Sequence, residues 1–84
     1  MPIDFQVQTK EVDLKFIKIV RTENHYSMAK TARLLGLSGT EKYLRRENGE
    51  YNFKPEELSV LADVWNVPME KFFTSNLRKK QENL

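Results

Sequence analysis

The sequence predicts a small all-α domain, a compact bundle of five helices preceded by a short strand or an extended arm. Apolar residues recur in five segments at the three- and four-residue spacing of amphipathic helices. Glycine, proline and asparagine fall between these segments, where helices begin and end. The chain has 84 residues and no cysteine, so one hydrophobic core must stabilise it without disulfide bonds.

The N-terminal region combines an extended segment with the first helix. Positions 3–8 alternate apolar and polar residues, and this period of two indicates a strand or an extended arm. Thr9 is a suitable N-cap for a helix that ends near Glu23. The apolar face of this helix is expected to contain Val12, Phe16, Ile19 and Val20. Residues 24–26 then interrupt the helical pattern.

Two short helices are expected next. Ser27 can cap the first of them, and Gly36 can end it because glycine tolerates the left-handed conformation found after helices. Its inner face is expected to contain Met28, Ala32 and Leu35. Ser38 and Glu41 have the spacing of a capping box, which predicts a second helix over 39–47.

Prolines mark the last two helices. Pro55 favours the first turn of a helix over 55–65, and Pro68 opens a final short helix that ends near Phe73. The predicted core contains Phe16, Val20, Ala32, Leu35, Leu37, Leu58, Leu61, Ala62, Trp65 and Phe72. The chain is therefore expected to consist of an arm over 1–11, a helical domain over 12–74 and a basic tail over 75–84.

Charge is distributed unevenly, although the net charge is only +2. Residues 27–49 carry +3, residues 50–70 carry −4, and the last segment from Lys71 carries +3. The basic middle segment suits contact with a polyanion, and a basic face exposed only to solvent is the other interpretation. No apolar run approaches the ~20 residues of a membrane span, and residues 1–9 lack the basic start and the apolar core of a secretory signal peptide. We expect a cytoplasmic protein with no membrane partner.

The sequence offers few residues for catalysis. His25 is the single histidine, there is no cysteine, and no glycine-rich loop is present to hold a phosphate. Trp65, Phe72 and Phe73 have helical spacing, which favours the core over base stacking. We expect no enzyme activity, no metal, no cofactor and no small-molecule substrate.

Several motifs occur together between Phe16 and Phe73. They are Arg21 eleven residues before Ala32, Ala32 followed by Gly36-Leu37-Ser38, Glu47-Asn48-Gly49, and Pro55 to Ala62 followed by Val67, Phe72 and Phe73. With these motifs the sequence resembles the phage Cro and repressor type of helix-turn-helix domain, the Xre-like family. The resemblance implies a lambda-repressor-like fold and a phage or prokaryotic repressor that binds double-stranded DNA as a homodimer. Its helix over 39–47 would enter the major groove.

The resemblance also implies roles for individual residues. The expected base-contacting residues are Thr40, Lys42, Arg45 and Arg46. The expected phosphate-contacting residues are Ser27, Lys30, Ser38, Asn52 and Lys54. Arg21 and Glu47 would form an ion pair that joins the first helix to the end of the DNA-reading helix. A solvent-exposed basic face remains the other interpretation, and Arg46 could pair with Glu50 on the surface. Glu41 is expected to cap the helix and not to read cytosine.

The sequence departs from the family pattern at two places. Tyr43 lies seven positions after Gly36 where family members usually show six, so an extra residue near Gly39 can shift the base-contacting positions by one. Met28 stands where the family commonly has a glutamine that touches phosphate. The alternative function is a protein-binding module, such as an antirepressor or antitoxin that docks on another regulator. Three features favour this alternative: the modest net charge, the altered turn near Gly39, and the apolar arm at 3–7.

Overall fold

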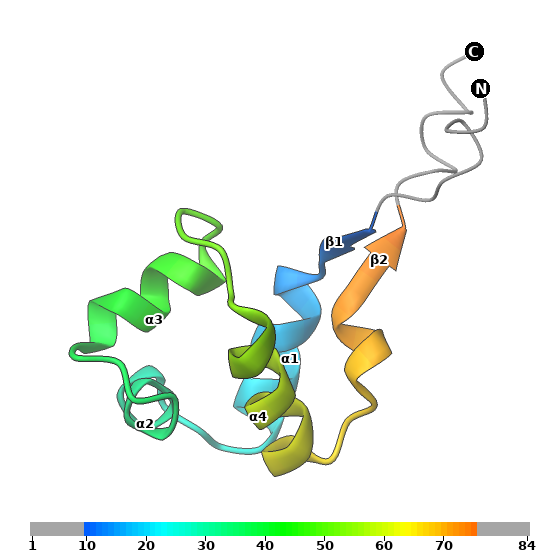
Figure 1. Cartoon of the computed structure of the whole chain (residues 1–84). Helices are drawn as coiled ribbons and strands as arrows, with labels where there is room; N and C mark the ends of the chain where they lie inside the picture. Colours follow the sequence, from blue (N-terminus) through cyan, green and yellow to red (C-terminus); the bar gives the residue numbers. More distant parts are fainter. Residues whose placement is uncertain (1–9, 76–84) are drawn as a thin grey trace.

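The computed structural model describes residues 10–75, and Figure 1 shows a mostly helical chain with a short two-stranded sheet. The elements are β1 (Lys10–Val12), α1 (Leu14–Glu23), α2 (Met28–Leu34), α3 (Thr40–Glu47), α4 (Pro55–Trp65), the 3-10 helix η2 (Met69–Phe72) and β2 (Phe73–Ser75). The mostly helical class is confirmed, and the last expected helix is a short 3-10 helix. The alternating segment at 3–8, Thr9 and most of the basic tail lie outside the described residues.

Helix α1 begins later than expected. Its N-cap is Asp13, whose Oδ1 accepts a hydrogen bond of 3.1 Å from the Phe16 backbone N–H. The expected start after Thr9 is wrong, because Val12 lies in β1. The expected apolar face is also partly wrong, since Ile19 is 50% exposed whereas Ile17 is fully buried.

The two-stranded sheet brings the two ends of the described chain together, as Figure 1 shows. β1 and β2 are antiparallel, with Glu11 opposite Thr74 and Val12 opposite Phe73. The Asp13 backbone N–H continues this pairing with a 2.7 Å hydrogen bond to the Phe72 carbonyl. Glu11 was expected in the arm, but it pairs with a residue from the far end of the domain.

The core is more aromatic than expected. Its buried residues are Ile17, Val20, Ala32, Tyr43, Phe53, Leu58, Leu61, Trp65 and Phe72. Four residues of the predicted core are only half-buried around it, namely Phe16, Leu35, Leu37 and Ala62. Tyr43 and Phe53 were not expected in the core, and their rings pack edge to face with centroids 5.9 Å apart. The inner face of α3 is thus fixed against the loop that precedes α4.

The connection between α2 and α3 sets where α3 begins. The Ser27 hydroxyl accepts a 3.0 Å hydrogen bond from the Lys30 backbone N–H, which confirms the expected cap of α2. Gly36 has φ +75°, and the next N–H, of Leu37, donates to the Ala32 carbonyl at 2.9 Å. The expected capping box is wrong, because Gly39 is the N-cap of α3 and no side chain caps this helix.

Candidate nucleic-acid interface

Helix α3 has a buried face and an exposed face with different chemistry. Tyr43, Arg46 and Glu47 are buried against the rest of the domain. At 100° per residue, Glu41, Arg45 and Asn48 lie on the opposite side, and all three are exposed. In Figure 1, α2 and α3 lie together on one side of the domain, away from the β1–β2 sheet. The exposed face of α3 is therefore a polar surface on a helix whose other side is embedded.

The ion pair that the resemblance implies between Arg21 and Glu47 is present and buried. Arg21 Nε lies 2.7 Å from Glu47 Oε2, and Nη2 donates to Oε1 at 3.2 Å, so the contact is bidentate. The Tyr43 hydroxyl donates to Glu47 Oε2 at 2.7 Å, and Arg21 Nη1 donates to the Tyr26 carbonyl at 2.8 Å. These bonds join α1 to the C-terminal half of α3.

Burial and hydrogen bonding shift the pKa values of two groups in this cluster. The hydrogen bond with Glu47 raises the pKa of the Arg21 guanidinium above its ordinary value, against the opposing effect of burial. Burial, followed by the hydrogen bond to Glu47, raises the pKa of the Tyr43 phenol. Tyr43 therefore remains a neutral hydrogen-bond donor at ordinary pH.

A second buried ion pair holds the neighbouring residue of α3. Arg46 is 8% exposed, and its Nε and Nη2 donate to the two carboxylate oxygens of Glu57 at 2.9 and 3.2 Å. Its Nη1 donates to the Lys42 carbonyl at 2.9 Å, and Glu57 Oε1 also accepts from the Lys54 backbone N–H at 2.9 Å. The expected base-contacting role of Arg46 is wrong, because its guanidinium is occupied between α3 and α4. The alternative pairing of Arg46 with Glu50 is also wrong.

Arg45 is the exposed arginine of α3. Its Nη1 lies 3.6 Å from Glu50 Oε1, and both side chains are about half exposed, at 46% and 54%. Its guanidinium also lies 5.7 Å from the centre of the Tyr51 ring. An exposed ion pair of this kind is worth only about 0.2–1 kcal/mol, so a ligand of higher charge can replace Glu50.

The remaining expected contacts lie on or beside α3. Thr40 is exposed in its first turn, and Lys42 is half-buried on its flank. The expected phosphate contacts are all exposed, and they lie at the start of α2, in the α2–α3 turn and in the α3–α4 loop, at Ser27, Lys30, Ser38, Asn52 and Lys54. Lys30 Nζ lies 4.2 Å from the centre of the Tyr26 ring, which holds this ammonium group near the domain surface.

Three exposed residues near Arg45 were missed by sequence reasoning. They are Leu44, which is 36% exposed, Asn48, and Tyr51, which is 45% exposed. Counting 100° per residue from the inward Tyr43 would have identified Leu44 and Asn48. Tyr51 lies beyond the helix, and no periodic pattern indicates its position.

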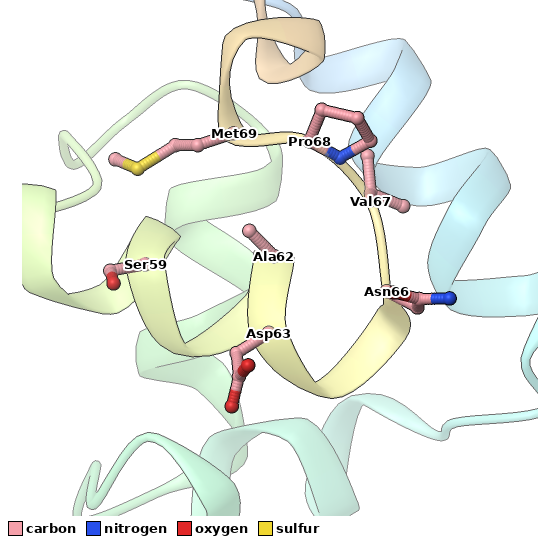
Figure 2. Close-up of a pocket in the computed structure, with 7 residues that line it drawn as sticks. All are labelled: Ser59, Ala62, Asp63, Asn66, Val67, Pro68 and Met69. Carbon is pink, nitrogen blue, oxygen red and sulfur yellow. The ribbon is translucent and has the colours of Figure 1, made fainter.

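The hollows of the domain surface differ from this interface. One, of about 460 Å³, lies between α4 and the segment that leads into η2 (Figure 2). Its polar side chains, including Asp63 and Asn66, do not converge on a common point. Another, of about 630 Å³, is lined by β1, the start of α1 and residues 49 and 51–53. Within residues 10–75, no group of three or more histidine, cysteine, aspartate or glutamate side chains is placed to hold a metal ion.

In comparisons with known proteins, no family model and no curated protein matches the chain. Within the described residues, no helix is long and apolar enough to cross a membrane. The function is therefore inferred from the geometry of the interface. Two buried ion pairs fix the inner face of α3, and its outer face presents exposed polar side chains around Arg45.

Proposed function

We propose that the protein is a sequence-specific DNA-binding transcriptional regulator of the phage-repressor type, in which α2, the turn and α3 form a helix-turn-helix. The observation that carries this proposal is the two-sided character of α3. Its inner side is fixed by ion pairs to α1 and α4, and its outer side is exposed and mostly polar. A rigidly held helix with an exposed polar face matches what the major groove of DNA accepts.

In this proposal the residues of α3 read bases and the surrounding residues bind the backbone. Arg45 is the principal base-contacting residue, because an arginine can donate two hydrogen bonds to guanine O6 and N7. Thr40 and Lys42 contact base edges or nearby phosphates from the first turn. The exposed phosphate candidates at 27, 30, 38, 52 and 54 position the domain without reading sequence.

A homodimer on DNA is part of the proposal. A domain of this size makes few phosphate contacts alone, and two-fold binding over half-sites about one helical turn apart multiplies them. The N-terminal arm and the region after Phe72 are the candidate contacts between the two copies. Sedimentation of a chain without its first eight residues distinguishes them, because an unchanged association state removes the arm.

Selection from a random duplex library tests the proposal directly. We expect the wild-type protein to enrich one sequence, and Arg45→Ala to reduce discrimination by about 1–3 kcal/mol at one base position. Lys30→Ala should weaken binding to all DNA sequences alike, and it should lower the number of counterions released on binding by about one. Lys71→Ala, which removes an exposed charge from η2, is the matched control. It should change neither the base discrimination nor the number of released counterions. The proposal fails if no sequence is enriched.

The protein-binding alternative is favoured by the apolar residues beside Arg45. Leu44 and Tyr51 are 36% and 45% exposed, and Glu50 offsets the charge of Arg45. An antirepressor or antitoxin would use this surface to dock on another regulator. Under this alternative, the library yields no enriched sequence, and Leu44→Lys abolishes binding to a regulator that co-purifies with the wild-type chain.

A further inference from the structure

Glu41 lies at the centre of the exposed face of α3, four residues before Arg45 and seven before Asn48. Its expected role as a cap is wrong, because the helix begins at Thr40 and no side chain caps it. Within residues 10–75, none of the ion pairs involves Glu41. A carboxylate thus stands without a partner charge in the middle of the proposed DNA-reading surface.

Gly39 makes room for this carboxylate. Its φ of −161° is extended backbone that any residue adopts, so the backbone does not require glycine at this position. A Cβ at residue 39 would lie 2.9 Å from Glu41 Oε1 and 3.3 Å from Glu41 Oε2. Gly36 differs, because its φ is +75° and nothing lies within 4 Å of an added Cβ. Gly39→Ala would therefore displace the Glu41 side chain.

The usual partner of Glu41 is directed elsewhere. An arginine four residues after a glutamate commonly pairs with it on a helix. Arg45 instead lies 3.6 Å from Glu50 and over the ring of Tyr51. If α3 enters a groove between two rows of phosphates, the negative charge of Glu41 opposes binding to every sequence unless a base donates a hydrogen bond to it.

We propose that Glu41 is a specificity-determining residue whose carboxylate accepts a hydrogen bond from N4 of cytosine, and that Gly39 is its positioning residue. This inference rests on the proposed function. In the major groove, guanine presents only acceptors, and thymine presents an acceptor and a methyl group. Adenine presents a donor beside the N7 acceptor, which repels a carboxylate. Cytosine presents its amino group with no acceptor of its own in the groove, so it is the base that Glu41 selects.

The test is library selection with the wild type and three variants, each verified as folded by circular dichroism. We expect the wild type to enrich cytosine at one position. Glu41→Gln should lower that preference about tenfold and move it towards adenine, because an amide donates to N7 and accepts from N6. Glu56→Gln is the matched control, since Glu56 is also an exposed glutamate in the first turn of a helix. It should leave the cytosine preference unchanged.

The third variant, Gly39→Ala, separates positioning from folding. It should keep the urea midpoint close to that of the wild type and reduce discrimination at the cytosine position alone. If Gly39→Ala discriminates at the cytosine position as well as the wild type does, the role of Gly39 is overturned. If the wild type enriches a sequence and Glu41→Gln keeps every preference, the role of Glu41 is overturned while the proposed function stands. If the wild type prefers adenine at the base position whose preference changes in Glu41→Gln, the cytosine assignment is overturned. If the wild type enriches no sequence, the proposed function and this inference fail together.

Discussion

Replacing Arg21 with methionine tests the buried cluster between α1 and α3. The Glu47 side chain is 3% exposed and accepts two hydrogen bonds from Arg21 and one from Tyr43. Arg21→Met leaves this carboxylate buried with Tyr43 as its remaining partner, and it removes the donor to the Tyr26 carbonyl. Removing one partner of a buried pair costs about 3–5 kcal/mol, which is a large part of the stability of a small domain.

Urea unfolding followed by circular dichroism measures this cost. We expect Arg21→Met to lower the free energy of unfolding by about 3–5 kcal/mol. If this variant is unfolded without urea, Tyr43→Phe tests the same cluster with a smaller loss of stability. It removes one of the three hydrogen bonds to Glu47 and should lower the free energy of unfolding by about 1–3 kcal/mol.

The double variant Arg21→Met with Glu47→Leu is the control for the pairing itself. Replacing both charges with apolar side chains of similar size is often close to neutral, but Glu47→Leu also removes the acceptor of the buried Tyr43 hydroxyl, so the double variant should recover part of the lost stability. A loss below about 1 kcal/mol for Arg21→Met, or no recovery in the double variant, refutes the assignment of a buried, coupled pair.

Three further outcomes are expected. Leu61→Ala should lower the free energy of unfolding by about 2–5 kcal/mol in urea melts, because Leu61 is fully buried between helices. Gly36→Ala should cost about 1–2 kcal/mol in the same assay, entirely from the positive φ of +75°, since an added Cβ meets no atom within 4 Å. Stability should fall as pH rises above the ordinary tyrosine pKa of 10.0, because burial raises the pKa of Tyr43 and only the unfolded chain then releases this proton. Urea midpoints of Tyr43→Phe should fall less steeply over that alkaline range, and equal slopes would contradict the pKa assignment.

Local chemistry made the helix starts at Ser27 and Pro55 predictable. A serine hydroxyl that accepts from the third N–H and a proline in the first turn act within a few residues. The start of α1 could not be predicted in this way. Val12 has the right spacing for α1, but it pairs with Phe73 across the sheet, which no local pattern records. Phe53 is similar, because an aromatic residue in a loop has no periodicity to indicate its burial.

The two neighbouring arginines show how far the candidate site could be predicted. Arg45 and Arg46 are the same residue type on the same helix, and charge counting treats them alike. Their difference arises from Glu57 in another helix, whose two carboxylate oxygens accept hydrogen bonds from Nε and Nη2 of Arg46. The position of Arg46 three residues after the inward Tyr43 indicates the buried side, but only the fold supplies its partner.

The adjacent residues Arg46 and Glu47 extend in different directions, one to α4 and the other to α1. Rotation of α3 about its own axis would break at least one of these contacts. The two ion pairs therefore fix the rotation of the helix, and its exposed residues are not needed for this. Positions 41, 45 and 48 can therefore change while the helix keeps its orientation. Under the proposed function, we expect chains with the same two ion pairs to gain new DNA preferences by a few substitutions on this face without loss of the fold.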